Sequence, residues 1–220
     1  MAKDCKAALH ESVTRFREWA KKTYPHITEY NDNGQLWPST DEYQDMMVCI
    51  LNVLKNTSPE DADDITVDDI LYGIARDDEC SVIMDDLEGL PQWFSLLCRK
   101  SVDTGYINAQ WQFAYSIGEY EGDDDLTDVL ERFISCGHEY TERMALRSMA
   151  KVCPEKAEGY AVKFFERDIY DADEYQKMMA LEVLYETGSD RLMHYLGIAE
   201  RSSYEHLKSS AAEIRRKLTE

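Results

Sequence analysis

Two stretches of this chain, Glu-Tyr-Thr-Glu-Arg-Met-Ala-Leu at residues 139–146 and Glu-Tyr-Gln-Lys-Met-Met-Ala-Leu at residues 174–181, agree at their Glu, Tyr, Met, Ala and Leu positions. Each stretch opens a helix, which a short break separates from a second helix. A period of about 35 residues built from helix pairs is typical of an α-solenoid, in which each pair buries its apolar face by stacking on its neighbours. We therefore predict an all-α fold of stacked antiparallel helix pairs.

The preceding helix pair follows the same pattern more loosely. With one common shift, Ile117 aligns with Met149 and Phe133 aligns with Phe165. These positions match in apolar character and mostly not in identity. We interpret this pair as a degenerate earlier copy of the repeat.

An Ala-Leu pair stands at the same place in both leading helices, at residues 145–146 and 180–181. In this feature, the part of the chain at residues 105–220 resembles HEAT-type repeats. The resemblance implies a protein-binding scaffold, since most HEAT-like proteins bind other proteins and a minority are enzymes. Residues 1–104 show no such repeat, and we expect them to form a less regular helical part of one continuous domain.

The N-terminal part begins with apolar residues at helical spacing, which predict a helix over residues 4–22. Turn-forming residues then predict a long loop over residues 24–39. We expect Ser39 and Thr66 to cap helices in this part and Ser202 to cap the last helix, because a hydroxyl at a helix N-terminus accepts a backbone hydrogen bond.

The charge of the chain limits its partners. It carries 24 Lys and Arg against 44 Asp and Glu, which gives a net charge of −20. This charge repels nucleic-acid phosphates and anionic lipid head groups, so we exclude both as direct partners. The acid is concentrated in residues 60–88, where Arg76 is the only cation. The acidic stretch is either a solvated face or a surface that docks a basic protein.

No catalytic or metal-binding motif stands out. The five histidines form no HExxH pair, and no glycine-rich phosphate loop or GxSxG turn occurs. Cys136 and His138 are near enough in sequence to share a metal ion, but further ligands are not close to them. A calcium loop starting at Glu29 would need a bidentate Glu where Thr40 stands. We therefore expect a non-enzyme without metal or cofactor.

The cysteines and the apolar runs indicate the compartment. Six cysteines are dispersed along the chain without a CxxC pair, which is typical of reduced thiols. The first residues lack the apolar core of a secretory signal, and no apolar run is long enough to span a bilayer. We expect a cytoplasmic protein.

The candidate binding residues lie on the expected surface. In a solenoid the second helices of successive units line one face, and their polar positions form a ladder. Trp37 and Tyr120 are loop aromatics of the kind that anchors interfaces, and Asp68 and Asp69 represent the acidic stretch. The candidate ladder residues are Asp128, Glu131, Lys163, Glu166, His194 and Arg201.

We therefore predict a protein-binding module whose acidic surface docks a basic protein, for example an immunity protein that neutralises a bacterial toxin. Two alternatives remain open. The first is an enzyme or metal-dependent protein that uses Cys136, His138 and nearby carboxylates, which stoichiometric zinc in the purified protein would favour. The second is a DNA mimic, which would compete with DNA for a basic protein.

Overall fold

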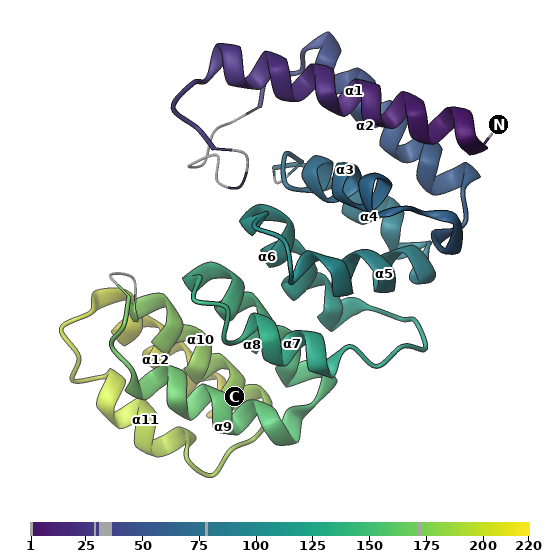
Figure 1. Ribbon diagram of the computed structural model, residues 1–220. Helices are drawn as coiled ribbons and strands as arrows, with labels where there is room; N and C mark the ends of the chain where they lie inside the picture. Colours follow the sequence, from purple (N-terminus) through teal and green to yellow (C-terminus); the bar gives the residue numbers. More distant parts are fainter. Residues whose placement is uncertain (1, 29, 31–36, 78, 171–172) are drawn as a thin grey trace.

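The computed structural model describes residues 2–28, 30, 37–77, 79–170 and 173–220, with side chains from residue 5 onward (Figure 1). Every regular element in these residues is a helix, which confirms the all-α prediction. The α-helices are α1 (Ala2–Thr23), α2 (Asp41–Asn56), α3 (Asp64–Ile74), α4 (Val82–Glu88), α5 (Pro91–Ser101), α6 (Ile107–Ser116), α7 (Thr127–Phe133), α8 (Glu139–Val152), α9 (Pro154–Glu166), α10 (Asp173–Glu186), α11 (Leu192–Ala199) and α12 (Glu205–Lys217). Short 3-10 helices lie at Pro59–Asp61 and Ile117–Glu119.

The N-terminal helices bury one aromatic cluster. Helix α1 lies along α2 and also touches α3 (Figure 1). Its residues Leu9, Val13 and Phe16 recur at helical spacing and are fully buried, because this stripe faces both neighbours. The Phe16 ring contacts the rings of Trp19, Trp37, Tyr43 and Tyr72. This cluster joins α1, α2 and α3 to the end of the loop that precedes α2.

The loop expected over residues 24–39 contains no helix where the structure describes it. The calcium loop considered from the sequence begins at Glu29 and includes residues 31–36, which lie outside the described residues.

The C-terminal helices follow one another through extensive contacts. Helix α6 packs on α8, α8 on α10, and α10 on α12, while α9 packs against both α8 and α10. Ala145, Ala180 and Ala211 are fully buried in α8, α10 and α12. A buried alanine presents little bulk, so neighbouring helices approach closely at these positions.

Two of the expected N-caps are wrong by one to three residues. Helix α2 is capped by Thr40, whose hydroxyl accepts from the Tyr43 amide at 3.3 Å, and not by Ser39. Helix α3 is capped by Asp63, which accepts from both the amide and the hydroxyl of Thr66. A carboxylate is the stronger acceptor at the positive end of a helix, so α3 begins before the predicted cap.

The last helix has an unusual cap. The Ser202 hydroxyl accepts from the Tyr204 amide and does not reach α12. Instead Glu174, at the start of α10, accepts from the amides of His206 and Leu207 at 2.8 and 3.1 Å. The prediction of Ser202 as the cap is therefore wrong, because a carboxylate from the neighbouring unit takes that place.

A buried polar network joins α8, the end of α9 and α10. Arg167 follows α9, and its guanidinium donates to Glu142 of α8 at 2.6 Å and to Gln176 of α10 at 2.7 Å. Glu142 is 3% exposed and also accepts from the Gly137 amide. Gly137 has φ of 82°, the left-handed conformation that glycine adopts without strain. These bonds fix the turn before α8 as well as the three helices.

Candidate functional site

The acidic stretch 60–88 receives cations from distant parts of the chain. Helices α1, α2 and α5 each send at least one basic side chain to it. The pairs are Lys6 with Asp63, His10 with Asp69, Arg17 with Asp68, Lys55 with Asp86, and Lys100 with Asp64. Much of this acid therefore fastens neighbouring helices to α3 and α4, which the local sequence does not show.

Asp68 and Asp69 illustrate this role. Asp69 is 1% exposed, and one of its carboxylate oxygens lies 2.9 Å from the His10 ring. Burial raises the pKa of Asp69. The half-buried Asp68 accepts from Arg17 and from the Tyr106 hydroxyl. The structure thus places Asp69 in the interior, and the expectation that its side chain lies on the open surface is wrong.

Of the predicted ladder residues, Glu131 is partly buried and the others are exposed, and most of them contact a neighbouring side chain. Three contacts link successive second helices. Asp128 of α7 binds Arg99 of α5, Glu131 of α7 binds Lys156 of α9, and Glu166 of α9 accepts from the Tyr195 hydroxyl of α11. Lys163 lies over the Tyr160 ring, His194 lies edge-on to Tyr195, and Arg201 is exposed after α11. The structure brings together Glu166 and His194 around Tyr195, whereas the other ladder residues occupy separate contacts.

The two loop aromatics are half-buried. Trp37 lies edge-on against Phe16, at 5.4 Å between ring centroids. Tyr120 stacks on Phe94 at 4.8 Å, and its hydroxyl donates to the Pro91 carbonyl. Both rings therefore contribute to packing within the chain.

Cys136 and His138 have a structural role at the start of α8. The His138 ring lies 3.0 Å from the Thr141 hydroxyl and caps the helix, and burial lowers the pKa of His138. Cys136 is exposed, but partial desolvation by its neighbours raises the pKa of its thiol, which disfavours the thiolate. In the described part of the chain, no three His, Cys, Asp or Glu side chains are grouped closely enough to hold a metal ion.

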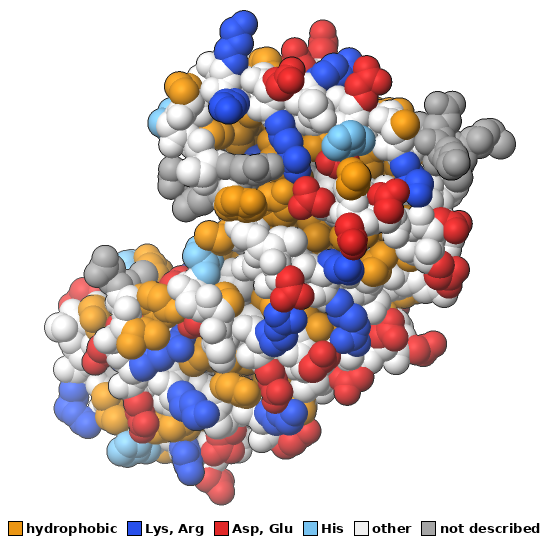
Figure 2. All heavy atoms as spheres, in the orientation of Figure 1, with side chains coloured by type: hydrophobic (Ala, Val, Ile, Leu, Met, Phe, Trp, Pro, Cys, Tyr) orange, Lys and Arg blue, Asp and Glu red, His pale blue; other side chains and the backbone are white. Residues whose placement is uncertain are grey.

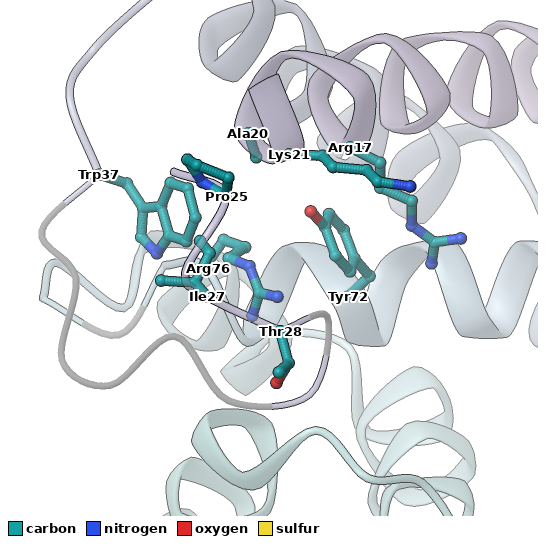
Figure 3. A pocket seen from close by; sticks show the side chains of 9 residues that line it. All are labelled: Arg17, Ala20, Lys21, Pro25, Ile27, Thr28, Trp37, Tyr72 and Arg76. Carbon is teal, nitrogen blue, oxygen red and sulfur yellow. The ribbon is translucent and has the colours of Figure 1, made fainter. Parts of the chain in front are cut away.

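A cavity of about 320 Å³ lies between α1, α3 and the loop that precedes α2 (Figure 3). Figure 3 shows the Tyr72 ring between the guanidinium groups of Arg17 and Arg76, which lie 4.4 and 4.6 Å from its centroid. Arg76 also lies over the Trp37 ring, and Arg17 binds Asp68. These interactions connect the walls of the cavity to one another. We therefore interpret the cavity as part of the packing interface between α1 and α3.

A row of aromatic side chains crosses the leading helices α6, α8, α10 and α12. We call Trp111, Tyr140, Arg143, Tyr175 and His206 the aromatic row. The Trp111 and Tyr140 rings are 5.1 Å apart, the Arg143 guanidinium lies 4.9 Å from Tyr140 and 5.4 Å from Tyr175, and Tyr175 stacks on His206 at 6.5 Å. Tyr140 is 37% and Tyr175 45% exposed, so the row is open to solvent.

Part of this row was visible in the sequence, although we sought the site on the second helices. The aligned copies share a Glu-Tyr pair at residues 139–140 and 174–175, and Glu-His at residues 205–206 takes the same place at the start of α12. A recurring aromatic residue in a solvent-facing position needs a reason other than core packing. The repeat itself is therefore the signal for the row.

One end of the row borders a groove of about 400 Å³ between α4, α6 and α8. Its α4 wall carries two acidic side chains and its α8 wall carries two arginines. The lining residues are Ser81, Met84, Asp85, Glu88, Trp111, Gln112, Tyr115, Ser116, Tyr140, Arg143, Met144 and Arg147. The groove combines exposed aromatic rings with charges of both signs, which is the composition of a protein-binding surface.

No family model matches the sequence, and no curated protein or solved structure matches it either. Among the described residues, no helix is both long enough and apolar enough to cross a membrane.

Proposed function

We propose that this chain is a cytoplasmic, non-enzymatic scaffold of HEAT-like stacked helix pairs that binds a basic protein through the aromatic row and the adjoining groove. The observation that carries the proposal is the recurrence of an exposed aromatic residue at the start of α8, α10 and α12. The contacts of α6 with α8, of α8 with α10 and of α10 with α12 support a repeat arrangement.

The side chains of the aromatic row are of the types that dominate protein interfaces. Tyrosine, tryptophan and arginine are enriched among the residues that dominate binding energy at protein interfaces, and the rings of tyrosine and tryptophan bury large areas at a low cost in conformational entropy. Tyr140 and Tyr175 already have Arg143 between them, so these side chains lose little freedom when a partner covers them.

The net charge of the chain favours a basic partner. A net charge of −20 attracts a cationic protein over long distances and accelerates its encounter at low salt. Figure 2 shows acidic side chains gathered along one edge of the face it displays, with Lys and Arg side chains among them. A small inhibitor that covers the basic active site of a toxin, as an immunity protein does, fits this combination of charge and exposed aromatic rings.

The test begins with an affinity pull-down in which the intact protein is the bait. The captured partner is identified, purified and measured by surface plasmon resonance at about 50 and 300 mM NaCl. We expect a basic partner whose association rate falls steeply with salt. We also expect the double variant Tyr140→Ala/Tyr175→Ala to bind about tenfold more weakly or worse, mainly through faster dissociation.

Ile65→Ala is the matched control, because Ile65 is a large apolar residue on α3 that is 58% exposed and lies outside the row. It should bind like the unmodified protein. An acidic partner, an association rate independent of salt, or equal binding by the double variant and the control would each contradict the proposal.

A further inference from the structure

The floor of the groove contains a buried acceptor without a donor. Gln112 of α6 is 2% exposed, and its amide nitrogen donates to the carbonyls of Ile74 and Asn108 at 2.8 and 3.0 Å. These two bonds fix the orientation of the amide. Its oxygen Oε1 then has no hydrogen-bond donor among the residues that the structure describes. An unsatisfied buried acceptor is energetically costly, so the floor of the groove is not fully satisfied by the side chains that line it.

The α4 wall supplies two more acceptors. Asp85 and Glu88 are both exposed and lie one turn apart on the same face of α4. Neither carboxylate forms an ion pair with any described residue, in contrast to Asp86 between them, which binds Lys55. The acidic wall therefore has unused capacity for a cation.

The opposite wall differs between its two arginines. Arg143 is bound to Glu139 at 2.9 Å, so its charge is largely compensated. Arg147 lies over the Tyr115 ring at 4.6 Å and forms no ion pair within the described residues. An occupant must therefore present a cation toward α4 and a hydrogen-bond acceptor, such as a backbone carbonyl, toward Arg147.

We propose that this groove binds an arginine-bearing extended segment of the basic partner, whose guanidinium lies between Asp85 and Glu88 over the rings of the α6 floor. This inference rests on the proposed function and names the partner chemistry of the same site. Arginine fits better than lysine because its planar group offers five donors and also stacks on the rings of Trp111 and Tyr115. Its backbone carbonyls meet Arg147.

The experiment uses capped octa-arginine and octa-lysine peptides as probes in about 150 mM NaCl. Binding is followed by calorimetry and by the NMR signal of the Trp111 indole, which Trp111→Phe assigns. We expect octa-arginine to bind about fivefold or more tightly than octa-lysine and to shift the indole signal.

Two variants with the same charge change locate the site. Asp85→Asn/Glu88→Gln should abolish the preference for arginine, whereas Glu121→Gln/Asp124→Asn, which changes exposed acids of the loop before α7, should keep it. Equal weakening by both variants, equal affinity for the two peptides, or an unshifted indole signal would overturn the groove assignment. The proposed function would survive that result if binding of the captured partner still depended on Tyr140 and Tyr175.

Discussion

Ser81 holds a backbone conformation that suits glycine. It precedes α4 with φ of 53°, and its side chain makes no cap hydrogen bond to the helix. A left-handed conformation costs an L-residue about 1–2 kcal/mol, and glycine avoids this cost. Glycine also loses more conformational entropy on folding, which offsets part of the gain. We predict that Ser81→Gly raises the free energy of unfolding by about 0.5–1 kcal/mol in urea denaturation.

Ser81→Ala is the control for this prediction. It removes the hydroxyl and keeps the strain, so its free energy of unfolding should stay within about 0.5 kcal/mol of the unmodified protein. Equal effects of the two substitutions would show that the φ angle is not the cause.

Asp69 makes the free energy of unfolding depend on pH, and its contribution falls as pH rises. Burial raises the pKa of Asp69, so the folded chain holds the carboxyl proton more tightly than the unfolded chain does. In the unfolded chain an aspartate has a pKa of about 3.9. The protonated Asp69 carboxyl therefore contributes its full stabilisation below the unfolded pKa, and this stabilisation is lost as pH rises through the raised pKa of the folded state. We predict that Asp69→Asn becomes more stable relative to the unmodified protein as pH rises through this window, measured by urea unfolding.

Asp103 provides a control of opposite sign. The hydrogen bond from Arg132 lowers the pKa of Asp103, so this carboxylate stabilises the fold above about 3.9 and loses that effect as pH falls. Asp103→Asn should therefore become less stable relative to the unmodified protein as pH rises. Parallel pH profiles for the two variants would refute the assignment.

Single residues also show where sequence reasoning reaches its limit. The recurrence of Tyr140 and Tyr175 was readable, but their exposure was not, because both lie in amphipathic helices whose contacts depend on neighbours. The surroundings of Asp69 were equally hidden, since its partner His10 lies far away in the chain.

At the scale of helices, periodicity was a reliable guide. The helix predicted over residues 4–22 spans Ala2–Thr23. The caps of α2, α3 and α12 were less predictable, because neighbouring hydroxyl and carboxylate groups compete and because Glu174 comes from another helix. Periodicity depends on burial along one element, whereas a cap depends on local geometry or on a neighbour.

The network around Arg167 gives a prediction for the junction of three helices. Arg167→Ala leaves the buried carboxylate of Glu142 without its cation. We predict a loss of about 3 kcal/mol in the free energy of unfolding, because an uncompensated buried charge is costly. Urea denaturation measures this loss, and the second substitution Glu142→Gln should recover part of it.

Arg132→Ala is the matched control, since its pair with Asp103 is solvent-exposed and its loss should cost much less than that of the buried pair. If Arg167→Ala cost no more than Arg132→Ala, the buried network would not be a determinant of stability.

At the scale of the whole molecule, the surplus of acid opposes folding. Contact ion pairs are screened little by salt, whereas repulsion among distant charges is screened as the Debye length falls from about 30 Å in 10 mM salt to about 8 Å in 150 mM salt. With a net charge of −20, we predict that Tm rises by about 2–4 °C over this range of NaCl in calorimetry.

A variant with less charge tests the cause. Glu121→Gln/Asp123→Asn/Asp124→Asn removes three exposed acids before α7, none of which forms an ion pair with the described residues. Its Tm should rise less with salt than that of the unmodified protein. A Tm that falls with salt in both proteins would mean that attractive pairs outweigh repulsion.

The carboxylate that Glu174 offers to α12 ties the end of the chain to the order of its synthesis. Protein synthesis proceeds toward the C-terminus, so Glu174 is added to the chain before the amides of His206 and Leu207 exist. The acceptor is therefore in the chain before α12 is, and α12 has a fixed starting point when it packs on α10. In this way a side chain of one unit sets where the helix of the next unit begins.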